Sequence, residues 1–330
     1  MKNYRVVIAL ALAALVSGTA LVPDTASAQT IGFGVNPQGS LYHRVGSAIS
    51  KLMNDKMSTK VRVQPFSGSS TYIPLLNRDE VRLALVTVSD TVNATEGVDN
   101  FKGRPQSDLR LINVMFLLRF GILVPNDSPV KKAADLKGML MPAGFTSQTT
   151  LIGVMKAMLA SAGLTPADIK PYPTPNVFKG VALLGEGKVQ AVTVAAGIAA
   201  TQKANIKLRS HGGVRFVSLG SNIAAMNAVV PSSPITVNPA PHLKGVLEPT
   251  EMMAFRVFLT TNAKASDEFV YKLIKLLHGN KKTLVGTTKA LGTFNPKQMA
   301  FNVNGKKGAV PYHPGAIKFL KEIGQWPSSK

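Results

Sequence analysis

Small polar residues gather at four places in the sequence, each directly before a stretch with helical periodicity. Hydroxyl groups and the free N–H groups at the start of a helix are donors that suit a carboxylate. In an open α/β sheet such loops converge at the carboxyl ends of the strands and form a binding cleft. The alternative is that these Ser and Thr side chains only cap their own helices. The four clusters are Gln38-Gly39-Ser40, Ser67-Gly68-Ser69-Ser70, Ser89-Asp90 and Thr146-Ser147-Gln148-Thr149.

The residue patterns of enzymes and cofactor sites do not match this sequence. The run from Gly32 to Gly39 has Pro37 where a dinucleotide-binding loop needs its third Gly. There is no Gly-x-Ser-x-Gly element, and none of the five His stands at the spacing of a metal-binding pair. We therefore expect a protein that is not an enzyme, with no catalytic residue, no metal and no cofactor.

The elements that must position the polar clusters alternate along the chain. Short β-type runs at 30–35, 60–66 and 81–88 are each followed by a helical stretch, which predicts an α/β fold. A long apolar β-type run at 109–125 ends this pattern, which then restarts. Within the restarted part, Ile206–Leu208 is expected to form a short strand.

The interrupted pattern predicts a clamshell of two lobes, with the ligand between them. We expect the first lobe at residues 29–122 and 225–330 and the second at 123–224, each a mixed sheet flanked by helices. Two crossing segments, near 120–124 and 225–235, would join the lobes.

The first 28 residues are typical of a cleavable signal peptide. Lys2 and Arg5 precede a long apolar run, and Ala26-Ser27-Ala28 offers small residues at the positions that signal peptidase reads. The sequence has no Cys, which excludes disulfides and a lipid attached to cysteine. We expect cleavage after Ala28 and a location in the periplasm.

The chain is strongly basic, with a formal net charge of +21. Removing the signal peptide takes away Lys2, Arg5 and Asp24 and leaves +20. Such a surface attracts anions, although a generally basic periplasm or proteome would explain it equally well. One Trp, six Tyr and no long Lys/Arg run speak against a nucleic-acid partner.

Several motifs in one order resemble the TAXI family of TRAP-transporter solute-binding proteins. Asp135-Leu136-Lys137-Gly138 is similar to the entry of that family's second lobe, and Pro311–Ala316 is similar to its C-terminal His-Pro-Gly-Ala helix. The remaining matches are Phe33-Gly34 through Gly39-Ser40-Leu41-Tyr42, Ser67-Gly68-Ser69-Ser70, and Glu80–Val86 with Ser89-Asp90 after it.

The resemblance implies a type II periplasmic binding-protein fold that captures a small organic anion, such as glutamate, glutamine or another carboxylate. It implies a sodium-driven TRAP-type membrane permease as partner, and we expect the protein itself to be a monomer. The implied ligand-binding residues are Gly39, Ser40, Tyr42, Ser67, Ser69, Ser70 and Ser89 in the first lobe, and Ser147 and Thr149 in the second.

The sequence departs from the family pattern in three places. The loop Thr146–Thr149 lacks the family's Gly residues, Tyr72-Ile73-Pro74 replaces a polar pair, and His43 replaces a second aromatic residue. These changes predict a bulkier, less polar pocket that prefers another carboxylate or an aromatic acid. Two alternatives remain: a binding protein of an ABC importer, and a basic surface protein that binds polyanions.

Overall fold

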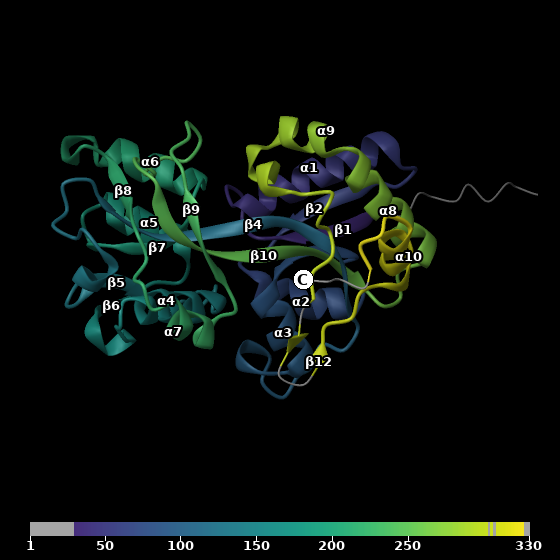
Figure 1. Cartoon of the computed structure of the whole chain (residues 1–330), viewed down its shortest axis with the longest axis horizontal. Coiled ribbons are helices and arrows are strands. Elements are labelled where there is room, and N and C mark those ends of the chain that lie inside the picture. Colours follow the sequence, from purple (N-terminus) through teal and green to yellow (C-terminus); the bar gives the residue numbers. More distant parts are fainter. Residues whose placement is uncertain (1–29, 303, 306–307, 327–330) are drawn as a thin grey trace, which may run out of the picture.

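The structure, a computed structural model, describes residues 30–302, 304–305 and 308–326. The expected signal peptide, residues 1–28, lies outside the described residues. Two bodies lie side by side, and two long strands, β4 (Leu109–Pro125) and β10 (Thr250–Asn262), run from one into the other (Figure 1). No helix in the described part of the chain is long and apolar enough to cross a membrane.

The first body is built on three parallel strands in the order β2-β1-β3. Each strand leads into a helix, as the alternation in the sequence predicts. The pairs are β1 (Ile31–Val35) with α1 (Leu41–Lys56), β2 (Val61–Pro65) with α2 (Ser69–Asn77), and β3 (Leu83–Thr87) with α3 (Val88–Glu96). The C-terminal part of the chain returns to this body with α8 (Asp267–Gly279), α9 (Lys281–Thr287), the short pair β11 (Asn304–Gly305) and β12 (Gly308–Ala309), and α10 (Pro314–Glu322).

Helix α1 illustrates how the sequence forms these elements. The Ser40 side chain accepts the His43 N–H at 3.0 Å and so caps the first turn. Val45, Ile49 and Met53, one helical turn apart, are fully buried against the sheet. Gly39 has a φ of +90° just before the cap, a conformation that side-chain-bearing residues rarely adopt.

Strands β4 and β10 belong to both bodies. They pair with each other antiparallel from Leu109–Asn262 to Phe120–Met253. Near its C-terminal end β4 also pairs with β7 and β8 of the second body, while β10 also pairs with β9 near its start and with β3 near its end. The result is one mixed eight-stranded sheet that extends through both bodies.

The second body surrounds the far ends of β4 and β10. It adds β7 (Val192–Ala195), β8 (Val214–Val217) and β9 (Ser233–Val237) to the large sheet, and holds a separate parallel pair, β5 (Leu140–Ala143) with β6 (Lys170–Pro173). Its helices are α4 (Thr150–Ser161), α5 (Val177–Gly185), α6 (Ala199–Lys207) and α7 (Ile223–Val229). Short 3-10 turns complete the chain at Asp99–Phe101, Ala133–Leu136, Pro166–Asp168, Arg209–His211 and Lys289–Thr293.

Two sequence-based expectations differ from this architecture. The strand expected at Ile206–Leu208 is wrong, because Ile206 and Lys207 form the last turn of α6. The chain also returns later than 225–235: α7 packs on α4, β9 pairs with the second-body end of β10, and the return is β10 itself. Of the three residues only Ile206 favours a strand, and this preference carries little weight where a helix already runs into the segment.

The C-terminal motif secures α10 to α8. The His313 side chain caps α10 by accepting the Gly315 N–H at 3.2 Å, and its other ring nitrogen lies 2.9 Å from the Ala265 carbonyl oxygen. Burial lowers the pKa of the His313 imidazole, which is therefore neutral while it caps the helix. A Cβ on Gly315 would lie 2.2 Å from the carbonyl oxygen of Asp267. The motif therefore serves to pack α10 against α8 in the first body.

Candidate functional site

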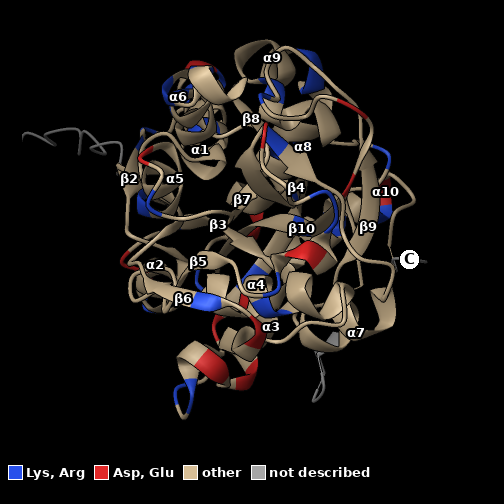
Figure 2. Ribbon diagram, turned by 90° about the vertical axis from the view of Figure 1, so that its left-hand side faces the viewer, with Lys and Arg blue, Asp and Glu red and all other residues tan. Residues whose placement is uncertain are grey.

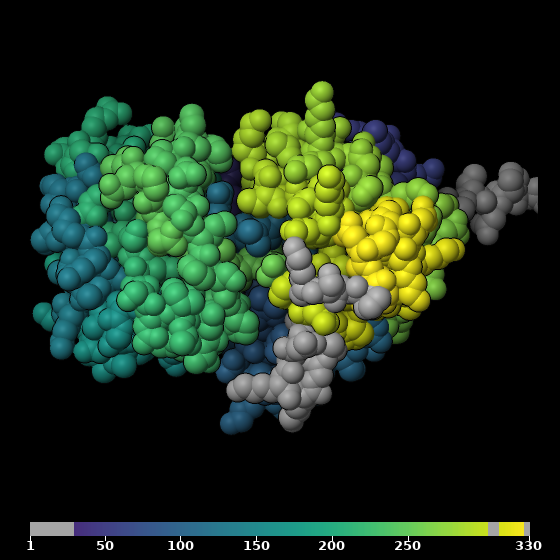
Figure 3. Space-filling model, in the orientation of Figure 1, coloured from purple at the N-terminus to yellow at the C-terminus, as the bar shows by residue number. Residues whose placement is uncertain are grey.

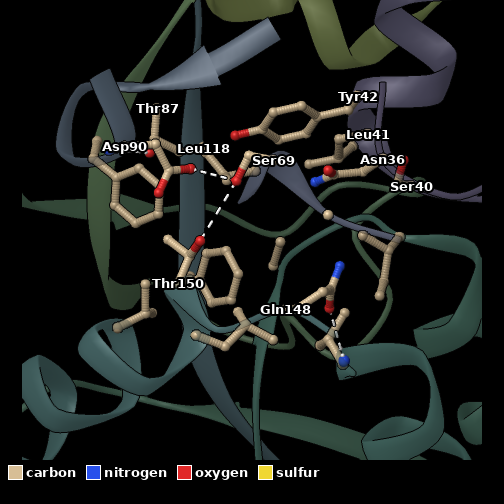
Figure 4. A pocket seen from close by; sticks show the side chains of 18 of the residues that line it. Asn36, Ser40, Leu41, Tyr42, Ser69, Thr87, Asp90, Leu118, Gln148 and Thr150 are labelled. Carbon is tan, nitrogen blue, oxygen red and sulfur yellow. Dashed lines mark hydrogen bonds between the residues drawn. The ribbon is translucent and has the colours of Figure 1, made fainter. Parts of the chain in front are cut away.

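A cavity of about 80 Å³ lies between the two bodies, at the ends of the strands. Figure 3 shows the bodies packed against each other with a groove between them on the face in view. Figure 4 shows the side chains that surround the cavity. It is lined by Asn36, Ser40, Leu41, Tyr42, Gly68, Ser69, Thr87, Asp90, Leu118, Phe120, Gln148, Thr150, Leu151, Val154, Val177, Phe178, Ala195, Ile198 and Phe255.

Helices α1 to α6 all begin at this cavity. For each of them a residue of the first turn, or the residue just before it, is part of the lining. The partial positive charge at a helix N-terminus is about half an elementary charge, and its N–H groups point out of the helix. The helix starts therefore favour an anionic or acceptor group in the cavity, although no Lys or Arg is among the described residues that line it.

The helix starts differ in how their N–H groups are satisfied. Ser40, Thr87 and Asn176 cap α1, α3 and α5 through side-chain oxygens. Helices α2, α4 and α6 start at Gly68, Thr149 and Ile198 without a side-chain cap from any described residue. The first N–H of α6, that of Ala199, is taken by the Gly39 carbonyl oxygen, so the starts of α2 and α4 offer the N–H groups that a bound solute can satisfy.

Ser69, Asp90 and Thr150 form a polar cluster across the cavity. The Ser69 hydroxyl donates to Asp90 Oδ2 at 2.6 Å and lies 3.4 Å from the Thr150 hydroxyl, which comes from the second body (Figure 4). The Asp90 residue is only 3% exposed. Burial raises the pKa of its carboxyl group above the ordinary value, although the hydroxyls of Ser69, Thr87 and Thr150 act in the opposite direction.

Tyr42 faces the same cluster from α1. Its ring is 4% exposed, and its hydroxyl points toward the side of the cavity where Ser69 and Asp90 lie (Figure 4). Burial, and then the charge of Asp90, raise the pKa of the Tyr42 hydroxyl well above the ordinary value. The phenol is therefore a neutral donor.

The rest of the lining is mostly apolar. Phe120 of β4 and Phe255 of β10 stack with ring centroids 5.8 Å apart and planes inclined by 21°. Leu118, Val154, Val177, Phe178 and Ile198 extend this surface. A solute that fits here presents polar atoms to the helix starts and an apolar part to the two central strands.

The two bodies contact each other next to the cavity, and we call this arrangement closed. The Ala199 N–H donates to the Gly39 carbonyl oxygen at 3.4 Å, and Arg44 donates to the Gly197 carbonyl oxygen. Gly68 also packs directly on the backbone of Ser147. These contacts join residues of different bodies.

The lining includes three of the nine residues predicted from the sequence: Ser40, Tyr42 and Ser69. The other six lie outside it, next to residues that do line it: Gly39, Ser67, Ser70, Ser89, Ser147 and Thr149. The Ser67 hydroxyl pairs with the Thr71 hydroxyl at 3.0 Å, and the Ser147 N–H donates to the Pro175 carbonyl oxygen at 2.9 Å.

Sequence reasoning missed Asp90 and Gln148 as lining residues, although both stood in the polar clusters it identified. Gln148 is 8% exposed, and its Oε1 accepts the Val177 N–H at the start of α5. Asn36 directly follows β1 and Thr87 is the last residue of β3, and no pattern in the sequence marked either of them as lining. The apolar wall comes from the middle of β4 and β10, where hydrophobicity alone does not separate lining from core.

The charges elsewhere are dispersed. Lys and Arg are spread over both bodies and form no single stripe in the view of Figure 2. Among the described residues, no group of three or more His, Cys, Asp or Glu could hold a metal ion.

The sequence matches the NMT1-like family over residues 33–324. A solved structure described as a periplasmic transporter is 14% identical, with 91% of this chain and 94% of that chain covered and a TM-score of 0.56, which shows the fold. The alkanesulfonate-binding protein of Xanthomonas axonopodis pv. citri, bound to MOPS, is 16% identical over 91% of this chain and 94% of its own, with a TM-score of 0.49. A TctC solute-binding protein from Polaromonas is 13% identical over 91% and 97%, with a TM-score of 0.49. The fold is that of the periplasmic binding proteins, as the sequence motifs implied.

Proposed function

Because this chain belongs to the NMT1-like family, we propose that it is a periplasmic solute-binding protein that captures a small organic anion between its lobes. The observation that carries the proposal is the convergence of the starts of α1 to α6 on one interlobe cavity. Charge-assisted hydrogen bonds from such groups contribute about 1.5–3 kcal/mol each. A carboxylate can accept several of them at once.

The cavity also limits what kind of anion fits. Its volume of about 80 Å³ suits a small solute, and Phe120, Phe255 and Phe178 favour one with an apolar part. A carboxylic acid with an aliphatic or aromatic body meets both conditions better than glutamate or glutamine, whose second polar group would face the apolar wall. This agrees with the departures from the TAXI pattern at Tyr72–Pro74 and Thr146–Thr149.

The two bodies close on the solute because each of them contributes hydrogen-bond donors to it. Ser69 and the α2 start belong to the first body, and Gln148, Thr150 and the α4 start belong to the second. A carboxylate held by both bodies stabilises the closed form relative to an open form. To move a 1:99 population to 99:1 the solute must prefer the closed form by about 5.5 kcal/mol, which two to four charge-assisted hydrogen bonds can supply.

The membrane partner in this proposal is a TRAP-type permease, on the strength of the motifs shared with the TAXI family. The same motifs and the signal-peptide pattern support export to the periplasm. A neighbouring gene for a large permease with many membrane spans would support this assignment, whereas a neighbouring ATPase gene would favour an ABC importer.

The direct test is a thermal-shift screen of the mature protein, residues 29–330, against small carboxylates. A solute that binds only the folded state at 100 times its Kd stabilises the protein by about 2.7 kcal/mol. We expect benzoate or 4-methylpentanoate to raise Tm and the corresponding neutral amides to raise it less. The shift should persist at raised ionic strength, because binding in a closed cavity depends on salt far less than polyanion binding does. A Tm that responds to heparin but to none of the carboxylates contradicts the proposal.

A further inference from the structure

Asp90 is a carboxyl group in a cavity that otherwise suits an anion. Of the described residues that line the cavity, Asp90 is the only acidic one, and none is Lys or Arg. An ionised Asp90 would repel a bound carboxylate across a short distance in a medium of low dielectric constant. For a carboxylate to bind here, the negative charge of Asp90 has to be absent or neutralised.

The surroundings of Asp90 consist of hydroxyl groups and apolar side chains. Ser69 donates to one carboxyl oxygen at 2.6 Å, Thr87 holds the Asp90 N–H at 3.1 Å, and the hydroxyl of Thr150 lies beside the Ser69 hydroxyl. No Lys, Arg or His of the described residues forms an ion pair with Asp90. A buried carboxyl group without a cationic partner is most stable with its proton attached.

The titratable groups that face Asp90 from neighbouring elements add no positive charge that would stabilise its ionised form. Tyr42 of α1 and Tyr72 of α2 are the titratable groups that interact with it, and burial raises the pKa of both phenols well above the ordinary value. Both are therefore neutral near neutral pH. The hydroxyls of Ser69, Thr87 and Thr150 act to lower the pKa of Asp90, but burial, which raises that pKa, is the larger effect.

We propose that Asp90 keeps its proton in the closed cavity and donates it in a hydrogen bond to the carboxylate of the bound solute. The proton stays on the Asp90 oxygen, and the ligand remains an anion that accepts the bond. The inference rests on the proposed function, since it names the group that contacts the solute. Asp90 thereby favours ligands that offer a hydrogen-bond acceptor. Where Asp90 is ionised in the free protein, it takes up one proton for each anion that is bound.

This coupling between anion binding and protonation of Asp90 makes the affinity depend on pH in one direction. The bound anion stabilises the neutral form of Asp90, so affinity is highest below the pKa of Asp90 in the free protein. Above that pKa the carboxyl group must be protonated before binding, and affinity falls about tenfold for each pH unit. The solute carboxylate itself stays ionised over this range and contributes no slope.

The test is a calorimetric titration of the mature protein with benzoate and with 4-methylpentanoate between about pH 6 and about pH 9. We expect Kd to rise toward high pH, with proton uptake that appears as a dependence of the binding enthalpy on the ionisation enthalpy of the buffer. Asp90→Asn places a permanent neutral donor at the site and should abolish both the slope and the proton uptake. Asp55→Asn changes an exposed carboxylate on α1 and serves as the matched control, with the slope unchanged.

The outcomes separate the inference from the function it rests on. If neither carboxylate binds at any pH, the proposed function fails for this solute class. If a carboxylate binds with a pH-independent Kd and without proton uptake, the function stands and the inference is overturned. If Asp90→Asn does not fold, the slope and the proton uptake of the unmutated protein still decide the question.

Discussion

Gly68, at the start of α2, lies so close to Ser147 of the other body that a Cβ on Gly68 would be 2.9 Å from the Ser147 carbonyl oxygen. The φ of Gly68 is 178°, an extended conformation that any residue can adopt. The need for Gly at this position therefore arises from the contact between the two bodies. This need for Gly exists only while the two bodies are in the closed form.

Gly68→Ala should weaken solute binding without harming the fold. The added methyl group overlaps the Ser147 carbonyl in the closed form but finds space when the bodies separate, and an overlap of this kind costs about 1–3 kcal/mol. We expect Kd to rise by about tenfold or more, measured by calorimetry, and ligand-induced compaction in small-angle scattering to be reduced. Gly279→Ala is the control, because a Cβ there meets nothing within 4 Å. Equal affinity for Gly68→Ala and Gly279→Ala would show that closure does not depend on this contact.

Ser69→Ala and Ser147→Ala should differ, although the sequence predicted both as ligand-binding residues. Ser69 lines the cavity and orients Asp90, whereas the Ser147 hydroxyl lies outside the lining. Loss of one hydrogen bond to a charged group corresponds to about a tenfold weaker Kd or more, which we expect for Ser69→Ala alone. Tm without ligand serves as the check on folding. A larger loss for Ser147→Ala would contradict the position of the cavity.

Gln148→Glu should weaken anion binding through charge. The Gln148 Oε1 accepts the Val177 N–H at 2.9 Å, and a Glu carboxylate can keep that bond while it adds a negative charge beside the solute. We expect Kd for benzoate to rise at least about a hundredfold, from repulsion in a low-dielectric cavity. Binding of benzamide, the neutral analogue, should change less. If both ligands lose affinity equally, Gln148 acts through shape and not through charge.

His313 should make the protein sensitive to acid. Burial lowers the pKa of His313 in the folded protein, while the unfolded chain binds a proton with an ordinary pKa near ~6.5. Stability is therefore complete at higher pH and is lost as pH falls below ~6.5 toward the folded pKa, because the unfolded state takes up the proton first. His313→Asn should reduce this slope of the unfolding free energy against pH and keep the α10 cap.

The matched variant for that experiment is His313→Ala. It also removes the titrating group, but it leaves the start of α10 without a cap, at a cost of about 1 kcal/mol. Denaturant unfolding at neutral pH should rank His313→Asn above His313→Ala. If the acid slope persists in both variants, another group causes it.

Much of the fold follows from local patterns in the sequence. The strand-to-helix alternation in the first body, the Ser40 cap and the apolar run that becomes β4 were all predictable, since each depends on neighbours in the chain. The position of the second crossing was not, because Pro and Asn between 231 and 249 resemble a linker wherever they lie. Only the pairing with β4 and β9 shows that the chain crosses within β10 and not at 225–235.

In the candidate site, too, some features follow from local sequence and others depend on tertiary structure. The sequence by itself determined the loops that meet at the cavity, because small polar residues before a helix satisfy its N–H groups locally. Only the tertiary structure decided that Asp90 and Gln148, rather than Ser89 and Ser147, line it. Adjacent residues at a helix start point about 100° apart, so the packing of α3 and α4 against the sheet selects which of two neighbours faces the solute.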